Sequence, residues 1–520
     1  MTDGSPQSAL AARWRSSCWT LWLDRPLGPV WCALGWVVST AVLVGIVTWL
    51  GGPDTGDAGQ SLSSTWAIAH GAIGCAYPPT RTFAAAGPAD PIVLIAPVYP
   101  LVSGVLAALF RLGHGVAFPT SAQLGPGCSH ALVAIAHWSA ASGVTTATLA
   151  LGYVGWLAIL VGVVVYLRAV GRGRRGWEPL TLLVLAICGP TMMPIGEMFH
   201  PQDLLAVGLC LVGLAAAVRD RWLVAGLVLA LAIESQQFAL LVAVPLFVVA
   251  LGGRRLRYGA GVVAGLAALL IPLGVLSAGR VWHAALLGSS RAGIDGIHGS
   301  GGTWLWETHV GGLALLVLAR GAPIVVAAWL AWLVRRRSVG PLDARALMRL
   351  VTISLALRLV FEVNLFGYYF MAVAVALVVL DVTAGRLRGP TLAWLVLVTL
   401  AFAPARGGLN PGVALPGVGL VVTPSLVVVT GLVILILRDV LAHRIRWQLV
   451  GFIVFVVLTC VPALWGVSPG EPEMPAWFWQ LVLVSSALAL ALAGGVSLSG
   501  SWRTTTWGDA RSRAVAHEAA

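Results

Sequence analysis

The chain has 520 residues, of which 58% are hydrophobic and only 10% are charged, and its mean hydropathy is +0.90. A soluble core of this composition would leave too little polar surface to face water, so the numbers exclude a large soluble domain and indicate a polytopic membrane protein. The sequence contains no lysine, so all 32 basic residues behind the net charge of +12 are arginine. They stand in short clusters between apolar runs, a pattern typical of cytoplasmic loops that argues against a nucleic-acid partner.

Apolar runs long enough to cross about 30 Å of hydrocarbon recur along the chain. The first run, at 28–50, is too long for the apolar part of a cleavable signal peptide, so we expect an uncleaved first span. We predict 14 spans, beginning near residues 28, 143, 179, 203, 222, 237, 259, 311, 347, 366, 390, 420, 447 and 477.

A further apolar run at 92–111 is interrupted by Pro97 and Pro100. If this run crossed the membrane, every later arginine cluster would move to the outer side, which the positive-inside rule opposes. If it does not cross, 25 of the 32 arginines lie inside. We therefore predict a juxtamembrane or re-entrant element within a long outer loop at about 51–142.

The predicted organisation is all-α, with both termini in the cytoplasm and many passes through the plasma membrane. We expect a cytoplasmic segment at 1–27 and a transmembrane core at 28–385. Additional transmembrane helices follow at 386–500, and a polar cytoplasmic tail follows at 501–520.

This topology places most acidic and polar residues at the outer ends of spans, so a chemical site is expected to face outward. Asp54 and Asp57 directly follow the first span. A carboxylate there can accept a proton from a hydroxyl group and orient it for attack. Alternatively, Asp57 caps a helix that begins near Ser61.

A second polar group occupies the turn before the span near 203. Pro201 suits the start of that helix, and an acidic residue in its first turn is favoured by the helix dipole. The other interpretation is a cluster that contacts sugar hydroxyls or phosphate, or that holds a metal ion. Its members are Glu197, His200, Gln202 and Asp203.

A third polar group, Glu234, Gln236 and Gln237, lies in the very short connection between two later spans. These side chains must sit close to the membrane surface. Burying them without partners would cost a few kcal/mol.

Arg358 and Glu362 stand four residues apart at the outer end of a span. They can form an ion pair along the helix, or Arg358 can bind a lipid phosphate through parallel hydrogen bonds. Tyr368 and Tyr369 either line a cavity or belong to an aromatic belt at the interface.

Two cysteines, Cys75 and Cys128, fall in the long outer loop. A disulfide is allowed outside the cytoplasm, but its formation depends on a distance that the sequence does not contain. The sequence alone does not decide whether this disulfide forms.

Four places in the chain resemble the GT-C superfamily of polytopic glycosyltransferases, and the actinobacterial mannosyltransferase-like members of family 87 are most similar. The likeness covers about residues 28–385. It is carried by Gly56, Asp57, Gly71 and Tyr77–Pro79, by Ala96–Pro100, by Phe199–Asp203 with Arg219–Trp222, Ala225–Gly226 and Glu234–Gln237, and by Arg358, Glu362 and Asn364–Tyr369.

The resemblance implies a polyprenyl-phosphate sugar as donor and a glycolipid or glycan as acceptor. It implies that Asp57, or else Asp54, is the general base and that Arg358 stabilises the leaving phosphate. Two features depart from the family pattern: a tyrosine expected shortly after the loop carboxylate is absent, and Gln236–Gln237 replaces a lysine–glutamine pair. A role for Mg²⁺ or Mn²⁺ is left open.

Two other functions remain open at this point. A transporter or flippase of lipid-linked sugars would place polar groups on broken helices near the membrane midplane, often in inverted repeats. A membrane assembly factor without catalysis would need no cluster of outer carboxylates. The collection of charge at the outer ends of spans, without a visible repeat, favours the enzyme.

Overall fold

The computed structural model of the chain describes residues 23–50, 55–77, 96–142, 144–196, 198–282, 320–338, 340–362 and 367–401, with two short strands beyond them. The strands, β1 (Val413–Leu415) and β2 (Leu420–Val422), form an antiparallel pair, and the remaining regular structure in the described part is helical. Apart from this strand pair, the predicted all-α character agrees with the described residues. The span predicted from about 420 begins instead with β2, and those predicted from 447 and 477 lie outside the described residues.

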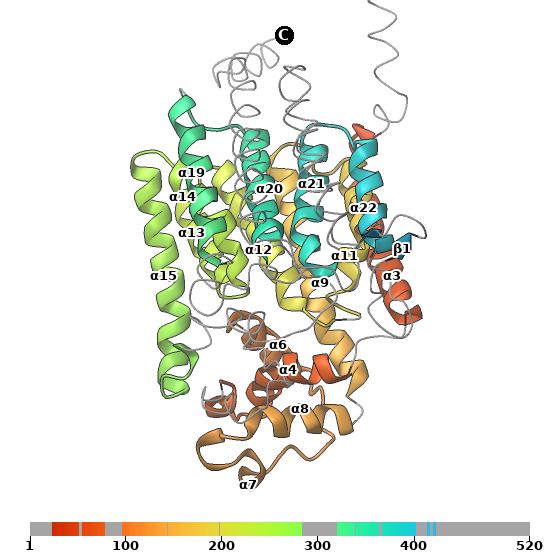
Figure 1. Ribbon diagram of the computed structural model, residues 1–520, viewed down its shortest axis with the longest axis vertical. Coiled ribbons are helices and arrows are strands. Elements are labelled where there is room, and N and C mark those ends of the chain that lie inside the picture. The colour runs from red at the N-terminus through yellow and green to blue at the C-terminus, as the bar shows by residue number, and fades with distance from the viewer. Residues whose placement is uncertain are drawn as a thin grey trace, which may run out of the picture. The chain divides into compact units, whose positions relative to one another are not determined.

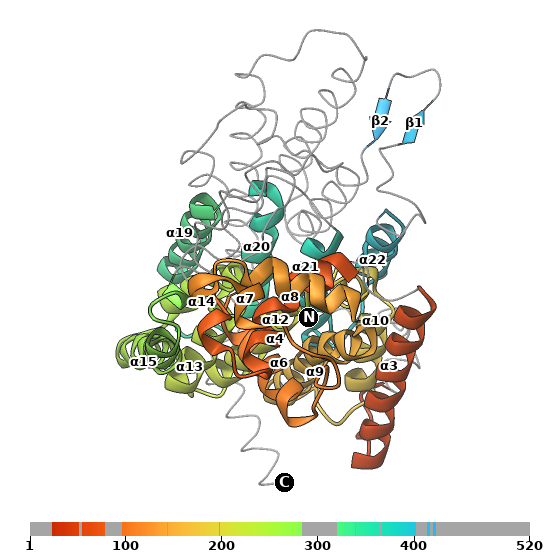
Figure 2. The ribbon, with the colours of Figure 1, turned by 90° about the horizontal axis from the view of Figure 1, so that it is seen from below.

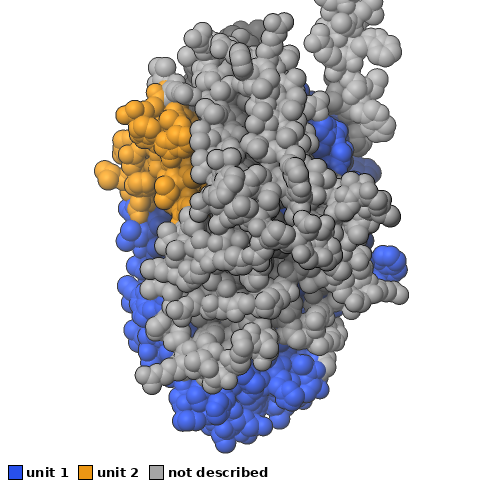
Figure 3. Space-filling model, viewed as in Figure 1, with its two compact units in different colours: residues 1–239, 260–292, 367–399 blue, residues 240–259, 293–366, 400–520 orange. Residues whose placement is uncertain are grey.

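The chain divides into two compact units, which Figure 3 shows in different colours. The first unit comprises Met1–Ala239, Ala260–Ala292 and Gly367–Thr399. The second comprises Leu240–Gly259, Gly293–Phe366 and Leu400–Ala520. Each unit therefore combines segments that are far apart in the sequence.

Four of the described helices are long and apolar enough to cross a membrane. At 1.5 Å per residue, even the shortest, with 18 residues, is about 27 Å long. Their positions agree with the spans predicted near 28, 143, 203 and 259. They are α3 (Pro29–Trp49), α9 (Thr145–Ala169), α12 (Pro201–Val218) and α15 (Gly253–Leu276).

Helix α12 forms the centre of the first unit, since 83% of its apolar window is buried, against 22% for α3. It packs along α9, where Gly162 faces Gly208. A Cβ atom on Gly208 would overlap the backbone of Ala158, so only glycine permits this approach. The close packing holds the first turn of α12, which carries Gln202 and Asp203.

The remaining helices are shorter than 18 residues, except α20, which has 18. Those of the first unit are α10 (Trp177–Ala186), α11 (Gly189–Met192), α13 (Trp222–Ile233), η3 (Gln237–Ala239), η5 (Gly367–Phe370), α21 (Met371–Thr383) and most of α22 (Gly389–Ala401). Those of the second unit are α14 (Leu240–Val249), α19 (Ala322–Arg337) and α20 (Ala344–Phe361), in which α14 packs against both α19 and α20.

The span predicted near 179 is not one continuous helix, which corrects the sequence interpretation. Helix α10 ends at Ala186, and α11 begins at Gly189. Backbone carbonyls released at such a break need other donors inside a membrane protein. The hydroxyl of Thr191 supplies one, because it bonds to the carbonyl oxygens of Leu185 and, at 2.8 Å, Cys188.

A layer of short helices lies beneath α9 and α12 in Figure 1 and faces the viewer in Figure 2. Helix α6 has 12 residues and is about 18 Å long, shorter than the roughly 30 Å of a bilayer's hydrocarbon core. The hydroxyl of Tyr99 donates to the carbonyl of Leu151 at 3.0 Å and ties α6 to α9. The layer consists of α4 (Thr55–Ala69), η1 (Ile73–Cys75), α6 (Val98–Leu109), α7 (Ser121–Leu124), η2 (Pro126–Cys128) and α8 (Ala131–Ala141).

The disulfide left open by the sequence is present. Cys75 and Cys128 are bonded, with Cα atoms 5.2 Å apart and 53 residues of sequence separation. In the chain-entropy account, closing a loop of this length stabilises the fold by about 4 kcal/mol. The bond joins η1 to η2 and so fixes the end of the segment that leads to Tyr77.

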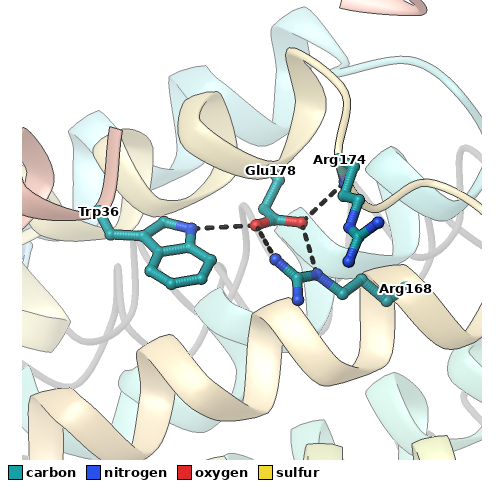
Figure 4. Close-up of polar contacts among 4 residues, drawn as sticks. All are labelled: Trp36, Arg168, Arg174 and Glu178. Atoms are coloured by element: carbon teal, nitrogen blue, oxygen red, sulfur yellow. Dashed lines mark hydrogen bonds and ion pairs between the residues drawn. The ribbon is translucent and has the colours of Figure 1, made fainter. Parts of the chain in front are cut away.

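At the other end of α9, buried carboxylates are paired with arginines. Glu178 is fully buried and accepts four hydrogen bonds (Figure 4): from Trp36 Nε1 at 3.0 Å, from Arg168 Nη2 and Nε at 3.2 and 3.3 Å, and from the backbone N–H of Arg174 at 2.9 Å. The sequence interpretation did not single out Glu178. Its satisfied carboxylate connects α3, α9 and α10.

Replacement of Glu178 by glutamine is expected to lower the free energy of unfolding by about 3 kcal/mol, because the buried donors lose a charged acceptor. Asp24→Asn is the matched control, since the Asp24 side chain is 39% exposed and its pairing with Arg172 contributes at most about 1 kcal/mol. Unfolding of the purified chain in detergent measures both. Equal losses in the two variants would show that burial of the Glu178 network adds nothing.

An aromatic stack in the layer of short helices contains His70. Its ring lies 4.3 Å from that of Phe118 and 4.5 Å from that of His114, and its Nδ1 lies 2.9 Å from the carbonyl of Trp66. Burial lowers the pKa of the His70 imidazole, and the neighbouring His114 lowers it further against the opposing effect of the Trp66 carbonyl. The stack is therefore built around a neutral His70 ring.

The stability of the chain is expected to fall on acidification for this reason. The folded-state pKa of His70 lies below its unfolded value of about 6.5. Its contribution is therefore complete above that pH and is lost as the pH falls through the folded-state pKa. His70→Phe keeps a ring in the stack but cannot titrate, so its unfolding midpoint should depend less on pH between 7.5 and 5.5. The exposed His137→Phe change is the control, and an unaltered pH dependence in His70→Phe would contradict the prediction.

Candidate functional site

The first turn of α12 brings two of the predicted polar groups into contact. Gln202 and Asp203 are 1% and 0% exposed. The side-chain amide of Gln236 donates a hydrogen bond to the carboxylate of Asp203, so the first turn of α12 meets the turn after α13. Asp203 lies in the first helical turn, as the sequence predicts, but the helix dipole is not its only partner.

His200 and the tyrosine pair lie together at the same end of the first unit. The ring of His200 is 4.3 Å from that of Tyr368, and the rings of Tyr368 and Tyr369 are 4.6 Å apart. Both tyrosines are at most 9% exposed. The interpretation of an aromatic belt is therefore wrong for this pair, because belt residues face the membrane interface.

Glu234 follows α13 and is only 6% exposed. Its backbone carbonyl accepts from the N–H of Val98 at 2.9 Å, which joins this turn to the start of α6. Burial raises the pKa of the Glu234 carboxyl to about 7. The hydroxyl of Tyr77 is its electrostatic neighbour: burial, and then the Glu234 charge, raise the pKa of Tyr77.

Gln237 begins η3 directly after this turn and is half-buried. It has a polar or ring contact within the chain. Two residues of the third predicted group thus make contacts with other segments: the Gln236 side chain bonds to Asp203, and the Glu234 backbone carbonyl bonds to Val98.

The two candidate bases lie at the limit of the described chain. Asp54 falls outside the described residues, as does Glu197. Helix α4 begins at Thr55, so Asp57 is in its first turn and the prediction that it caps a helix starting near Ser61 is wrong. An acidic residue in a first turn is favoured by the helix dipole.

Arg358 and Glu362 belong to the second unit and form the predicted ion pair, with Nε and Oε2 3.5 Å apart. A second arginine, Arg320, donates from Nη1 to the same oxygen at 2.7 Å. Glu362 is buried, with 2% of its side chain exposed. Two guanidinium groups therefore meet at one buried carboxylate, and guanidinium is the side-chain group best suited to bind a phosphate through parallel hydrogen bonds.

Metal binding finds no support among the residues that the structure describes. Within them, no three or more histidine, cysteine, aspartate or glutamate side chains form a group that could hold an ion. The predicted set of Glu197, His200 and Asp203 is incomplete there because Glu197 lies outside the described part. The role of Mg²⁺ or Mn²⁺ stays open.

Sequence reasoning did not assign a role to two residues of these clusters. Arg320 carried a signal, because an arginine within an apolar run is a functional hypothesis by default. For Tyr77, the only signal in the sequence was that it belongs to one of the segments that resemble the GT-C superfamily. No family model, curated protein or solved structure matches the chain. The site is therefore argued from its own residues.

Proposed function

We propose that the chain is a membrane glycosyltransferase of the GT-C type with about fourteen spans. It transfers a mannosyl- or arabinosyl-like unit from a polyprenyl-phosphate donor to a glycolipid or glycan acceptor on the extracytoplasmic face. The observation that carries the proposal is the contact between polar residues of separate segments at one end of α12, namely Asp203 with Gln236 and His200 with Tyr368. The arginine cluster around Arg219 lies at the opposite end of the same helix.

In the proposed reaction, Asp57 accepts the proton of an acceptor hydroxyl. The hydroxyl oxygen forms a bond to the anomeric carbon while the bond from that carbon to the phosphate oxygen breaks, so the anomeric configuration inverts. Polyprenyl phosphate leaves with the electron pair as an anion. The chain is placed in the plasma membrane with both termini in the cytoplasm, which keeps this chemistry outside.

The leaving phosphate is assigned to the arginine pair of the second unit. Arg358 and Arg320 already share the carboxylate of Glu362, so their guanidinium groups are held in place before the ligand arrives. A preorganised cation stabilises charge as it develops without reorganising at the moment of reaction.

Asp57→Asn is expected to reduce release of polyprenyl phosphate from radiolabelled polyprenyl-phosphate mannose by about 10²- to 10⁴-fold, the usual effect of losing a general base. Asp220→Asn, the same chemical change at the arginine-rich end, should leave the rate unchanged. The elution profile in size-exclusion chromatography checks folding. Unchanged turnover in Asp57→Asn would remove the general-base role, and loss of activity in Asp54→Asn alone would transfer it to Asp54.

Arg358→Ala is expected to raise the KM for the donor roughly ten- to a hundredfold, because a charge-assisted hydrogen bond contributes about 1.5–3 kcal/mol. The acceptor KM should change less. Arg336→Ala, an exposed arginine stacked on Trp332 in the same unit, is the control. A normal donor KM in Arg358→Ala would leave Arg358 as an ion-pair partner only.

A flippase of lipid-linked sugars is the second candidate, and the break between α10 and α11 favours it. Discontinuous helices within apolar segments are typical of transporter binding sites. Reconstituted vesicles distinguish the two functions. Movement of a fluorescent polyprenyl-phosphate sugar between leaflets without cleavage would support the flippase, whereas release of polyprenyl phosphate supports the transferase.

A further inference from the structure

Among the buried polar atoms of the first unit that lack a hydrogen-bond partner within the part of the chain that the structure describes, three belong to candidate site residues on nearly fully buried side chains. They are Tyr77 Oη, Gln202 Oε1 and Glu234 Oε2, on side chains that are 1%, 1% and 6% exposed. Buried polar atoms nearly always have a partner, and each one left without costs about 1–3 kcal/mol. Three such atoms in one unit indicate an occupant that supplies the missing bonds.

The three side chains belong to one neighbourhood. The N–H of Val98 bonds to the Glu234 carbonyl, and Val98 packs in the same buried cluster as Tyr77. Phe199 and Leu205, which stand on either side of Gln202 in the sequence, belong to that cluster as well. Gln202 precedes Asp203, which accepts a hydrogen bond from Gln236, two residues beyond Glu234. The atoms thus come from the layer of short helices, from the first turn of α12 and from the turn after α13.

Each of the three is held by contacts that do not involve the occupant. The Cys75–Cys128 disulfide lies two residues before Tyr77. The N–H of Val98 bonds to the Glu234 carbonyl, and Pro201 begins the helix that carries Gln202. The arrangement is therefore preorganised, which reduces the entropy lost when a ligand binds.

The chemistry of the three atoms selects the ligand. An ionised carboxylate in this place would repel an anion, and burial raises the pKa of the Glu234 carboxyl to about 7, so the protonated form is populated at neutral pH. A protonated carboxyl and a phenol both donate, and the amide oxygen of Gln202 accepts. Hydroxyl groups satisfy both kinds of partner because each one donates and accepts. Buried apolar neighbours such as Phe199 and Leu205 suit the carbon face of a sugar ring.

We propose that Tyr77, Gln202 and Glu234 form a binding site for an uncharged polyhydroxylated group, a hexose or pentose unit. The assignment of this unit to a lipid-linked sugar rests on the proposed function, but sugar binding does not require transfer. Tyr77 and Glu234 act here as specificity-determining residues.

The test compares the affinity of the purified full chain for polyprenyl-phosphate mannose, polyprenyl-phosphate arabinose and bare polyprenyl phosphate. The wild type should prefer a sugar-bearing lipid. Tyr77→Phe should reduce this preference at least fivefold without changing the affinity for the bare lipid. Tyr99→Phe is the matched control, because that hydroxyl already has a partner in Leu151. Loss of the Tyr99 hydroxyl should lower the stability of the chain but should not change its preference for the sugar-bearing lipid.

Glu234 provides an independent arm. Glu234→Gln should keep the preference, since an amide is uncharged and still donates, and Glu234→Leu should lose it. The proposal would be overturned if the wild type bound sugar-bearing and bare polyprenyl phosphate with equal affinity. It would also be overturned if the preference of Tyr77→Phe for the sugar-bearing lipid stayed within twofold of the wild-type preference. Loss in Glu234→Gln as large as in Glu234→Leu would overturn the acid form. A selective site without release of polyprenyl phosphate would leave the inference standing while the transferase fails.

Discussion

Hydrocarbon cannot solvate a charge, and this constraint organises the chain. A charged side chain in the membrane must reach an end of its helix or meet a partner, because its transfer to the bilayer centre costs at least about 3 kcal/mol. Glu178 meets the second requirement through four donors, and Asp381 does so through Arg388, whose Nε lies 3.1 Å away. Near the opposite end of α12, by contrast, the buried Oε1 of Gln202 has no hydrogen-bond partner within the described residues.

The same constraint explains how much could be predicted from the sequence. Span positions follow from local composition, so α3, α9, α12 and α15 were predictable to within a few residues. The shortness of α6 was predictable from arginines far away, since one extra crossing would have moved every later cluster outward. Both predictions rest on the apolar composition of segments and on the number of arginines in each loop, and neither requires knowledge of side-chain packing.

Properties that depend on contacts between distant segments were not predictable. The ion pair of Arg358 with Glu362 is local and was expected, but the second cation, Arg320, is 42 residues from Glu362 in sequence. The helix break at Ile187 depends on a threonine hydroxyl that replaces lost backbone bonds. The meeting of Tyr77 with Glu234 needs both the layer of short helices and the bundle, and the disulfide remained undecided until its Cα distance was known.

The disulfide also ties the candidate sugar site to a particular compartment. A bond between Cys75 and Cys128 forms and persists only under oxidising conditions, which the cytosol does not offer. Tyr77 stands two residues beyond that bond, so the candidate site takes its described shape only where the two thiols are oxidised. With both thiols reduced, the chain would lack the closed loop that restrains Tyr77. The oxidation state of one cysteine pair thus sets whether the candidate site is preorganised.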